Sequence, residues 1–256
     1  MVDKDKNKGH TEEPENASRR DFLKKSGYAA GGVAGGLVLG GLFGQFDTAE
    51  EGANSDQVEQ LQNARTFFKR REDFETLAYA SERIYPEDEN GPGAIKLGVP
   101  YFIDKQLAGY YGYNAKTYMK GPFQPQKSGE YGLQTKLNRG EVFLHGLRKM
   151  QEVSQKDFGS KFAELEGEQQ DEILRKFEAN EIKLKGVQSS IFFELLRQTT
   201  IEGVYSDPVY GGNKDMQGWK MIEYPGPRMG WASEIDAEEF LSKEPMSLKE
   251  YQGGNL

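Results

Sequence analysis

The stretch VQSSIFFELLRQTTI, residues 187–201, is the most apolar helical segment of the chain and decides its fold. Its large apolar side chains recur every three or four residues, the spacing that places side chains on one face of an α-helix. A helix with this much apolar surface has to be covered by other elements of the protein. The residues that carry the pattern are Ile191, Phe192, Leu195, Leu196 and Thr199.

Segments with the same period precede this helix, and no run of alternating residues indicates a strand. Thr66 is expected to cap the first of them and Pro86 to end it. We therefore expect a mainly α fold, with a single helical domain over residues 65–230 that ends in a long irregular segment rich in Gly, Pro and aromatic residues. Helices are expected over residues 66–85, 99–111, 142–153, 158–165 and 173–177.

The overall composition excludes several classes of function. The formal net charge of −8 disfavours nucleic acid and anionic lipid as partners. The absence of cysteine excludes disulfides, c-type haem attachment, thiolate-bound iron–sulfur clusters and Cys-ligated zinc. With 36% hydrophobic residues among 256, the chain has enough apolar material for one sizeable core. The fold therefore has to be held together by that core.

The N-terminal 46 residues have the features of an export signal. Residues 18–25, SRRDFLKK, match the twin-arginine signal, in which two arginines and one variable residue precede Phe-Leu-Lys. Residues 26–46 carry no charge, and about 20 residues suffice to span a membrane. Eight glycines keep this stretch weakly apolar, which suits the route that exports folded proteins. The signal residues are Arg19, Arg20, Phe22 and Leu23.

Two questions about this leader stay open at the level of sequence. Because no Ala-x-Ala site follows the apolar stretch, residues 26–46 are either cleaved off or retained as an anchor. The alternative to the twin-arginine signal is an ordinary transmembrane anchor behind basic residues. Both interpretations place the body at the outer face of the cytoplasmic membrane, in the periplasm or cell-wall space. An acidic linker over residues 47–64 and an acidic tail over residues 231–256 flank the helical domain.

A search for catalytic motifs finds none. The sequence has two histidines, of which His10 lies in the leader and His145 in an expected helix. It lacks a Gly-x-Ser-x-Gly elbow, a His-Glu-x-x-His motif, a P-loop and a Gly-x-Gly-x-x-Gly fingerprint. The acidic loop before Gly91 fails as an EF-hand, because Pro86 and Leu97 would occupy ligand positions. We therefore assign no catalytic, cofactor-binding or metal-binding residue, although an irregular calcium site and paired carboxylates remain open.

The most unusual segment covers residues 203–228 and combines turn residues with aromatic ones. Gly and Pro favour tight turns, while Tyr and Trp supply broad amphipathic surface that is typical of binding surfaces. Two interpretations apply: a surface for a partner, and a loop that its aromatic side chains pin onto the helices. The predicted partner-binding residues are Tyr205, Asp207, Pro208, Tyr210, Gly211, Gly212, Asn213 and Trp219.

Three features together resemble the gluconate 2-dehydrogenase subunit 3 family. They are the twin-arginine leader, the helix end and loop from Arg83 to Gly98, and the stretch YSDPVYGGN at residues 205–213 with Gly218-Trp219 and Tyr224-Pro225-Gly226. The resemblance extends over roughly residues 65–230. The late motif is specific, whereas residues 112–185 show only generic amphipathic helices. Three segments depart from the family pattern: the long charged leader, the acidic linker and the acidic tail. They leave open whether the chain pairs with a gluconate dehydrogenase or with a different oxidoreductase.

The resemblance implies a non-catalytic accessory subunit of an exported FAD-dependent gluconate, sugar or alcohol dehydrogenase. In such complexes the large subunit carries FAD, and a multihaem cytochrome c or another acceptor takes the electrons. The small subunit is expected to aid maturation of the flavoprotein and to provide the twin-arginine signal with which both proteins pass through the translocase. Two alternatives stay open: a stand-alone extracytoplasmic enzyme that uses carboxylates, and an anchored binding protein.

Overall fold

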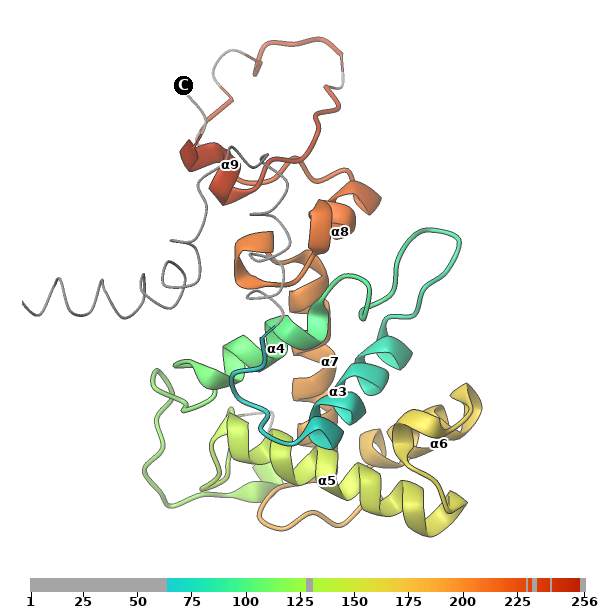
Figure 1. The fold of residues 1–256 in the computed structure, drawn as a ribbon. Helices are drawn as coiled ribbons and strands as arrows, with labels where there is room; N and C mark the ends of the chain where they lie inside the picture. The colour runs from blue at the N-terminus through green and yellow to red at the C-terminus, as the bar shows by residue number, and fades with distance from the viewer. Residues whose placement is uncertain (1–63, 128–130, 229, 232–233, 240, 254–256) are drawn as a thin grey trace, which may run out of the picture. The chain divides into compact units, whose positions relative to one another are not determined.

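The computed structural model describes residues 64–127, 131–228, 230–231, 234–239 and 241–253 (Figure 1). The expected leader and most of the linker, including the signal residues Arg19, Arg20, Phe22 and Leu23, lie outside this part. The described residues form helices and no strand apart from an isolated bridge between Asp88 and Gly91, which confirms the mainly α fold class. None of the described helices is long and apolar enough to span a bilayer.

Seven α-helices and several short 3-10 helices make up the described part of the chain. The last two α-helices are short: one lies within the unusual segment of residues 203–228, after 3-10 helices at Pro208–Tyr210 and Lys214–Met216, and the other near the end of the described residues. The α-helices are α3 (Arg71–Ile84), α4 (Val99–Ala108), α5 (Arg139–Phe158), α6 (Gly167–Glu178), α7 (Ser189–Tyr205), α8 (Gln217–Met221) and α9 (Leu248–Gly253).

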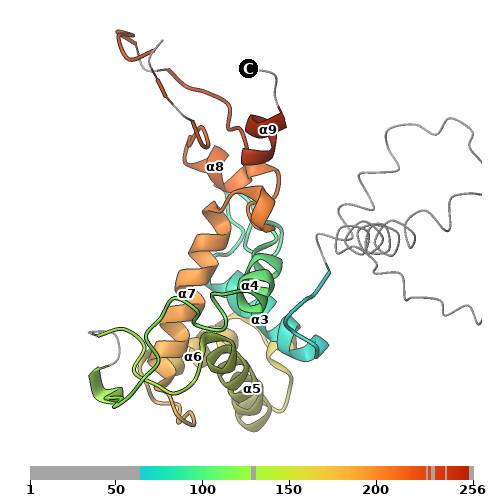
Figure 2. The same cartoon turned by 90° about the vertical axis from the view of Figure 1, so that its left-hand side faces the viewer.

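Helix α7, which contains the apolar stretch, is the element around which the others pack. It contacts α3, α4, α5, α6 and α8, and Figure 2 shows α8 near one end of α7 and α5 and α6 toward the other. The buried ring of Phe192 meets Phe143 of α5 and Phe177 of α6 edge to face, with ring centroids 5.8 and 5.5 Å apart. Such pairs add about 1 kcal/mol to the burial of their area. A Cβ at Gly146 would overlap the Phe192 ring, so a glycine on α5 makes this approach possible.

The start of the domain is fixed by Asp104 of α4, whose side chain is fully buried. Its carboxylate accepts backbone N–H groups from Thr66 at 2.5 Å, Phe67 at 3.1 Å and Phe68 at 2.9 Å. A buried carboxylate needs such donors, because an unpaired charge in the interior is costly. The expectation that Thr66 caps the first helix was therefore wrong: its N–H binds Asp104, and α3 begins only at Arg71.

Two other helix ends differ from the periodic pattern because of glycine. Helix α5 ends at Phe158, where Gly159 adopts a left-handed φ of 73°, and the expected continuation is a 3-10 helix at Phe162–Glu164. Helix α4 ends at Ala108 rather than near residue 111, with Gly109 as an extended C-cap. Conversely, α5 begins three residues before the expected start, since Asn138 and Glu141 form a capping box.

Replacing Asp104 with Asn should lower the free energy of unfolding by about 3 kcal/mol, because three hydrogen bonds lose their charged acceptor. Chemical denaturation of the full chain measures this change. Asp236→Asn, at an exposed position, is the control and should change stability by less than about 0.5 kcal/mol. Equal stability of the two variants would contradict the role of Asp104.

Candidate functional site

Two stretches far apart in sequence meet beside the C-terminal end of α7. One is the loop between α3 and α4, residues 85–98, and the other is the segment from Tyr205 to Met221. The N–H of Lys214 donates to the carbonyl of Leu97 at 3.1 Å. Gly98 has a left-handed φ of 75°, and a Cβ atom added to it would lie only 3.0 Å from the Gly211 carbonyl oxygen. We call this region the motif junction, because both stretches carry the sequence resemblance.

The aromatic side chains of the two stretches contact each other directly. The hydroxyls of Tyr85 and Tyr205 lie 3.5 Å apart, and their rings pack edge to face with centroids separated by 6.3 Å. The Tyr85 hydroxyl also lies 3.8 Å from the sulfur of Met221. Burial, followed by the hydrogen bond with Tyr205, raises the pKa of Tyr85 well above its usual range. Tyr85 therefore stays neutral, and the two tyrosines pack against each other through their rings and hydroxyls.

The segment after α7 supplies donors to the last carbonyl groups of this helix. The Trp219 indole N–H donates to the Tyr205 carbonyl at 2.8 Å, and the Asn213 amide donates to the Ser206 carbonyl at 2.8 Å. The Ser206 hydroxyl donates to the Gly203 carbonyl at 3.1 Å. Carbonyl groups at a helix end have no partner within the helix, so these side chains satisfy them.

Glycines make this close approach possible. A Cβ at Gly218 would overlap the Val204 carbonyl oxygen, and one at Gly212 would overlap the Gly203 carbonyl oxygen. Asn213 takes a left-handed φ of 48°, and its side-chain oxygen accepts the Gly218 N–H at 2.7 Å. The Gly and Asn positions of the motif are thus explained by backbone geometry.

Asp207 links the motif junction to the C-terminal helix. One carboxylate oxygen accepts the Val209 N–H at 3.0 Å and caps the 3-10 helix that Pro208 begins. The other oxygen accepts the Leu248 N–H at 2.7 Å at the start of α9. Both oxygens of this nearly buried carboxylate therefore have backbone donors.

The eight predicted partner-binding residues differ widely in exposure. Tyr210 is exposed, with 51% of its surface accessible, and so is the adjacent Val209 at 54%, which the sequence analysis did not select. The residue type at position 209 could have indicated its exposure, because an apolar side chain in a turn-rich segment has no helical face to cover. The predicted residues that are buried are Asp207, Gly212, Asn213 and Trp219, and those of intermediate exposure are Tyr205, Pro208 and Gly211.

Two further groups at the motif junction were not predicted from sequence. Ile95 of the α3–α4 loop is exposed, and its carbonyl accepts the Gly98 N–H at 3.0 Å. The side chain of Lys105 packs over Gly211. Burial lowers the pKa of Lys105, an effect that the negative charge of the neighbouring Asp104 opposes.

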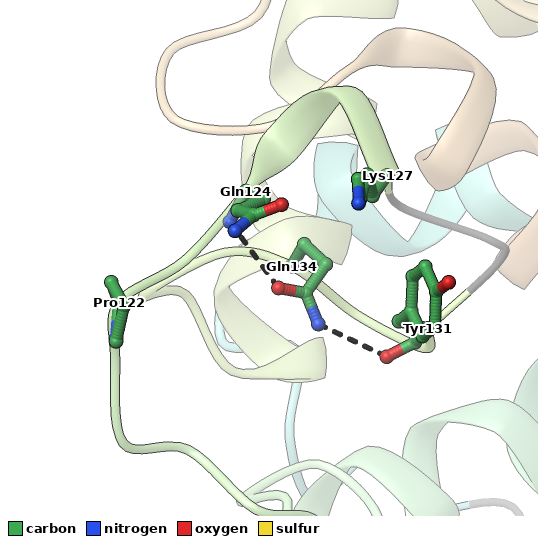
Figure 3. A pocket seen from close by; sticks show the side chains of 5 residues that line it. All are labelled: Pro122, Gln124, Lys127, Tyr131 and Gln134. Carbon is green, nitrogen blue, oxygen red and sulfur yellow. Dashed lines mark hydrogen bonds between the residues drawn. The ribbon is translucent and has the colours of Figure 1, made fainter.

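A hollow of about 270 Å³ lies elsewhere, in the loop between α4 and α5 (Figure 3). Its residues bridge the loop: the Gln124 N–H donates to the Gln134 side chain at 3.2 Å, whose amide donates to the Tyr131 carbonyl at 3.0 Å. Pro122 and Lys127 are the other described residues of the lining, and none of these five residues carries a carboxylate or an imidazole. Within the described ranges, no group of three or more His, Cys, Asp or Glu side chains is arranged to hold a metal ion.

Comparison with known proteins gives one match. The family model described as gluconate 2-dehydrogenase subunit 3 matches residues 71–226, more than half of the chain. No curated protein and no solved structure gives a significant match. The matched range begins with α3 and ends just after Tyr224 and Pro225, so it includes both stretches of the motif junction.

Gly218→Ala should lower the free energy of unfolding by about 1–3 kcal/mol, because the added methyl group overlaps the Val204 carbonyl and separates α8 from α7. Thermal unfolding and the near-ultraviolet circular dichroism of Trp219 measure the effect. Gly230→Ala is the matched control, since no atom lies within 4 Å of a Cβ there. Similar behaviour of both variants would contradict the close packing at Gly218.

Proposed function

Because the chain belongs to the gluconate 2-dehydrogenase subunit 3 family, we propose that it is a non-catalytic accessory subunit of an exported FAD-dependent dehydrogenase that oxidises gluconate, another sugar acid, a sugar or an alcohol. The family name describes one subunit of a larger dehydrogenase, so a dehydrogenase partner follows from membership. The observation that carries the proposal is the motif junction, where the two family-like stretches meet and where Val209 and Tyr210 are the most exposed large hydrophobic residues.

The chemistry of the motif junction supports a binding role over a catalytic one. Both oxygens of Asp207 and both ends of the Asn213 amide are occupied by groups of the same chain. A general acid or base needs a free position that faces its substrate. The Tyr85 and Tyr205 hydroxyls face each other. This arrangement disfavours Asp207 as the general acid or base of a stand-alone carboxylate enzyme.

Two adjacent exposed residues of the motif junction, Val209 and Tyr210, are of the kinds expected at the centre of an interface. Tyr210 contributes a large side chain that loses little conformational freedom on binding, and Val209 adds an apolar neighbour. The 3-10 helix that contains both residues is capped by Asp207, so the surface is already ordered before a partner arrives. We propose that the FAD-containing large subunit binds here.

Export completes the proposed function. The twin-arginine signal at Arg19 and Arg20 would carry this chain and the bound flavoprotein through the translocase together, after FAD has been inserted in the cytoplasm. The complex would then lie at the outer face of the cytoplasmic membrane, anchored by residues 26–46 if these are retained. A cytochrome c subunit or another acceptor would take the electrons from the flavin.

Val209→Ala combined with Tyr210→Ala should raise the Kd for the flavoprotein subunit about 10- to 100-fold, because the pair forms the exposed centre of the surface. Co-purification followed by titration of the separated subunits measures the change. Tyr118→Ala, which removes a tyrosine with 78% exposure beside the start of α5, is the control and should leave the Kd unchanged. Undiminished binding by the double variant would reject this docking surface.

Arg19→Lys combined with Arg20→Lys should retain both this chain and the flavoprotein in the cytoplasm, because the twin-arginine route discriminates between the two basic residues. Cell fractionation with an activity stain for the dehydrogenase measures the distribution. Lys24→Arg combined with Lys25→Arg keeps the twin arginine and the charge, so it should export normally. Normal export of the flavoprotein with the first variant would contradict joint transport.

A further inference from the structure

A basic hollow of about 340 Å³ lies between α5 and the loop that joins α6 to α7. Its lining contains His145, four cationic side chains and a single carboxylate, that of Glu152. This local excess of positive charge contrasts with the net charge of −8 for the whole chain. A concave surface of one sign concentrates ions of the opposite sign. The four cationic residues are Arg148, Lys149, Lys183 and Lys185.

Two of the four cationic groups are already committed to carboxylates. The Arg148 guanidinium binds the buried Asp73 through Nε at 3.2 Å and a terminal nitrogen at 3.1 Å. The Lys149 ammonium donates to Glu152 at 2.6 Å. Within the described part of the chain, neither Lys183 nor Lys185 forms an ion pair. These two lysines therefore provide the charge that is available to a ligand.

The available groups indicate the class of ligand. Lysine ammonium groups bind phosphate as point charges, and two of them attract a phosphate group, with its charge of about −2, more strongly than a single carboxylate. The planar fork of Arg148, which would suit either anion, is occupied by Asp73. Apart from His145, no aromatic side chain among the described residues lines the hollow, so it offers no phenyl, phenol or indole ring on which a base or a flavin could stack.

We propose that this basic hollow binds a phosphate-bearing anion through Lys183 and Lys185. Either a soluble phosphate or diphosphate group, including that of a dinucleotide, or the head group of a phospholipid has this chemistry. The site lies apart from the motif junction and is independent of the proposed subunit role. Failure of one assignment therefore leaves the other standing.

His145 gives the experiment a local reporter. One of its ring nitrogens, Nδ1, lies 3.3 Å from the Lys185 carbonyl, so a ligand at Lys185 changes its surroundings. The chain has two histidines, and a His10→Gln variant assigns the signals. Imidazole resonances of the isotope-labelled full chain are followed during titration with pyrophosphate, with short-chain phosphatidylglycerol below its critical micelle concentration and with acetate, at constant ionic strength and pH.

The expected result is a saturable shift of the His145 signal with at least one phosphate probe and none with acetate. Lys183→Gln combined with Lys185→Gln should weaken the apparent affinity about tenfold, since both charges that are available to the ligand are removed. Lys116→Gln combined with Lys120→Gln, at two exposed lysines outside the hollow, is the charge-matched control and should retain the shift.

The probes also distinguish the two sources of phosphate. Saturation by pyrophosphate alone assigns a soluble phosphate or diphosphate ligand, saturation by the lipid alone assigns a head group, and saturation by both supports the shared chemistry. The proposal is overturned if no phosphate probe saturates, if acetate acts as strongly, or if both pairs of lysine substitutions have the same effect.

Discussion

The C-terminal end of α7 imposes the constraint on which the motif junction depends. Gly203 and Val204 are buried and Tyr205 and Ser206 are half-buried, so the carbonyl groups at this end of the helix and at its C-cap have little access to water. The protein satisfies them with side chains from the following segment, above all Trp219 and Asn213. To deliver these donors, the chain has to turn back tightly against α7. The requirement for Gly at positions 212 and 218 follows from that return path.

The same constraint separates the inward from the outward residues of the motif. Polar groups that cap the helix or the following turns, such as those of Asn213 and Asp207, are used within the chain. The side chains of Tyr210 and Val209 cap no helix or turn, and both are exposed to solvent. The two interpretations of the segment thus apply to different residues. Most of its residues hold the loop against the helices, and the few that remain exposed form the surface for a partner. A surface ordered in this way costs less entropy when a partner binds.

The sequence predicted those features that depend on local periodicity or on motif composition. Repeating apolar residues identified α7, α5 and α6, and unusual composition identified the motif. It failed where a partner distant in sequence decides the outcome. Thr66 resembled a helix cap, but Asp104, 38 residues away, binds its N–H. Likewise, composition could not reveal that Trp219 points inward to the Tyr205 carbonyl. The net charge of −8 concealed the basic hollow, because a sum over the chain carries no information on position.

On the proposed export route, the buried carboxylate of Asp104 would also help the domain to resist mechanical force. Any pull on the leader enters the described domain at Thr66, the first of three consecutive residues whose N–H groups bind Asp104. Part of the load therefore passes to α4, which packs against α7, in addition to the contacts of Arg65 and Phe68 with Phe74 in the first turn of α3. Three charge-assisted hydrogen bonds loaded together resist opening more than a frayed helix end would. A domain that has to remain folded and bound to its cargo during transport would benefit from this attachment.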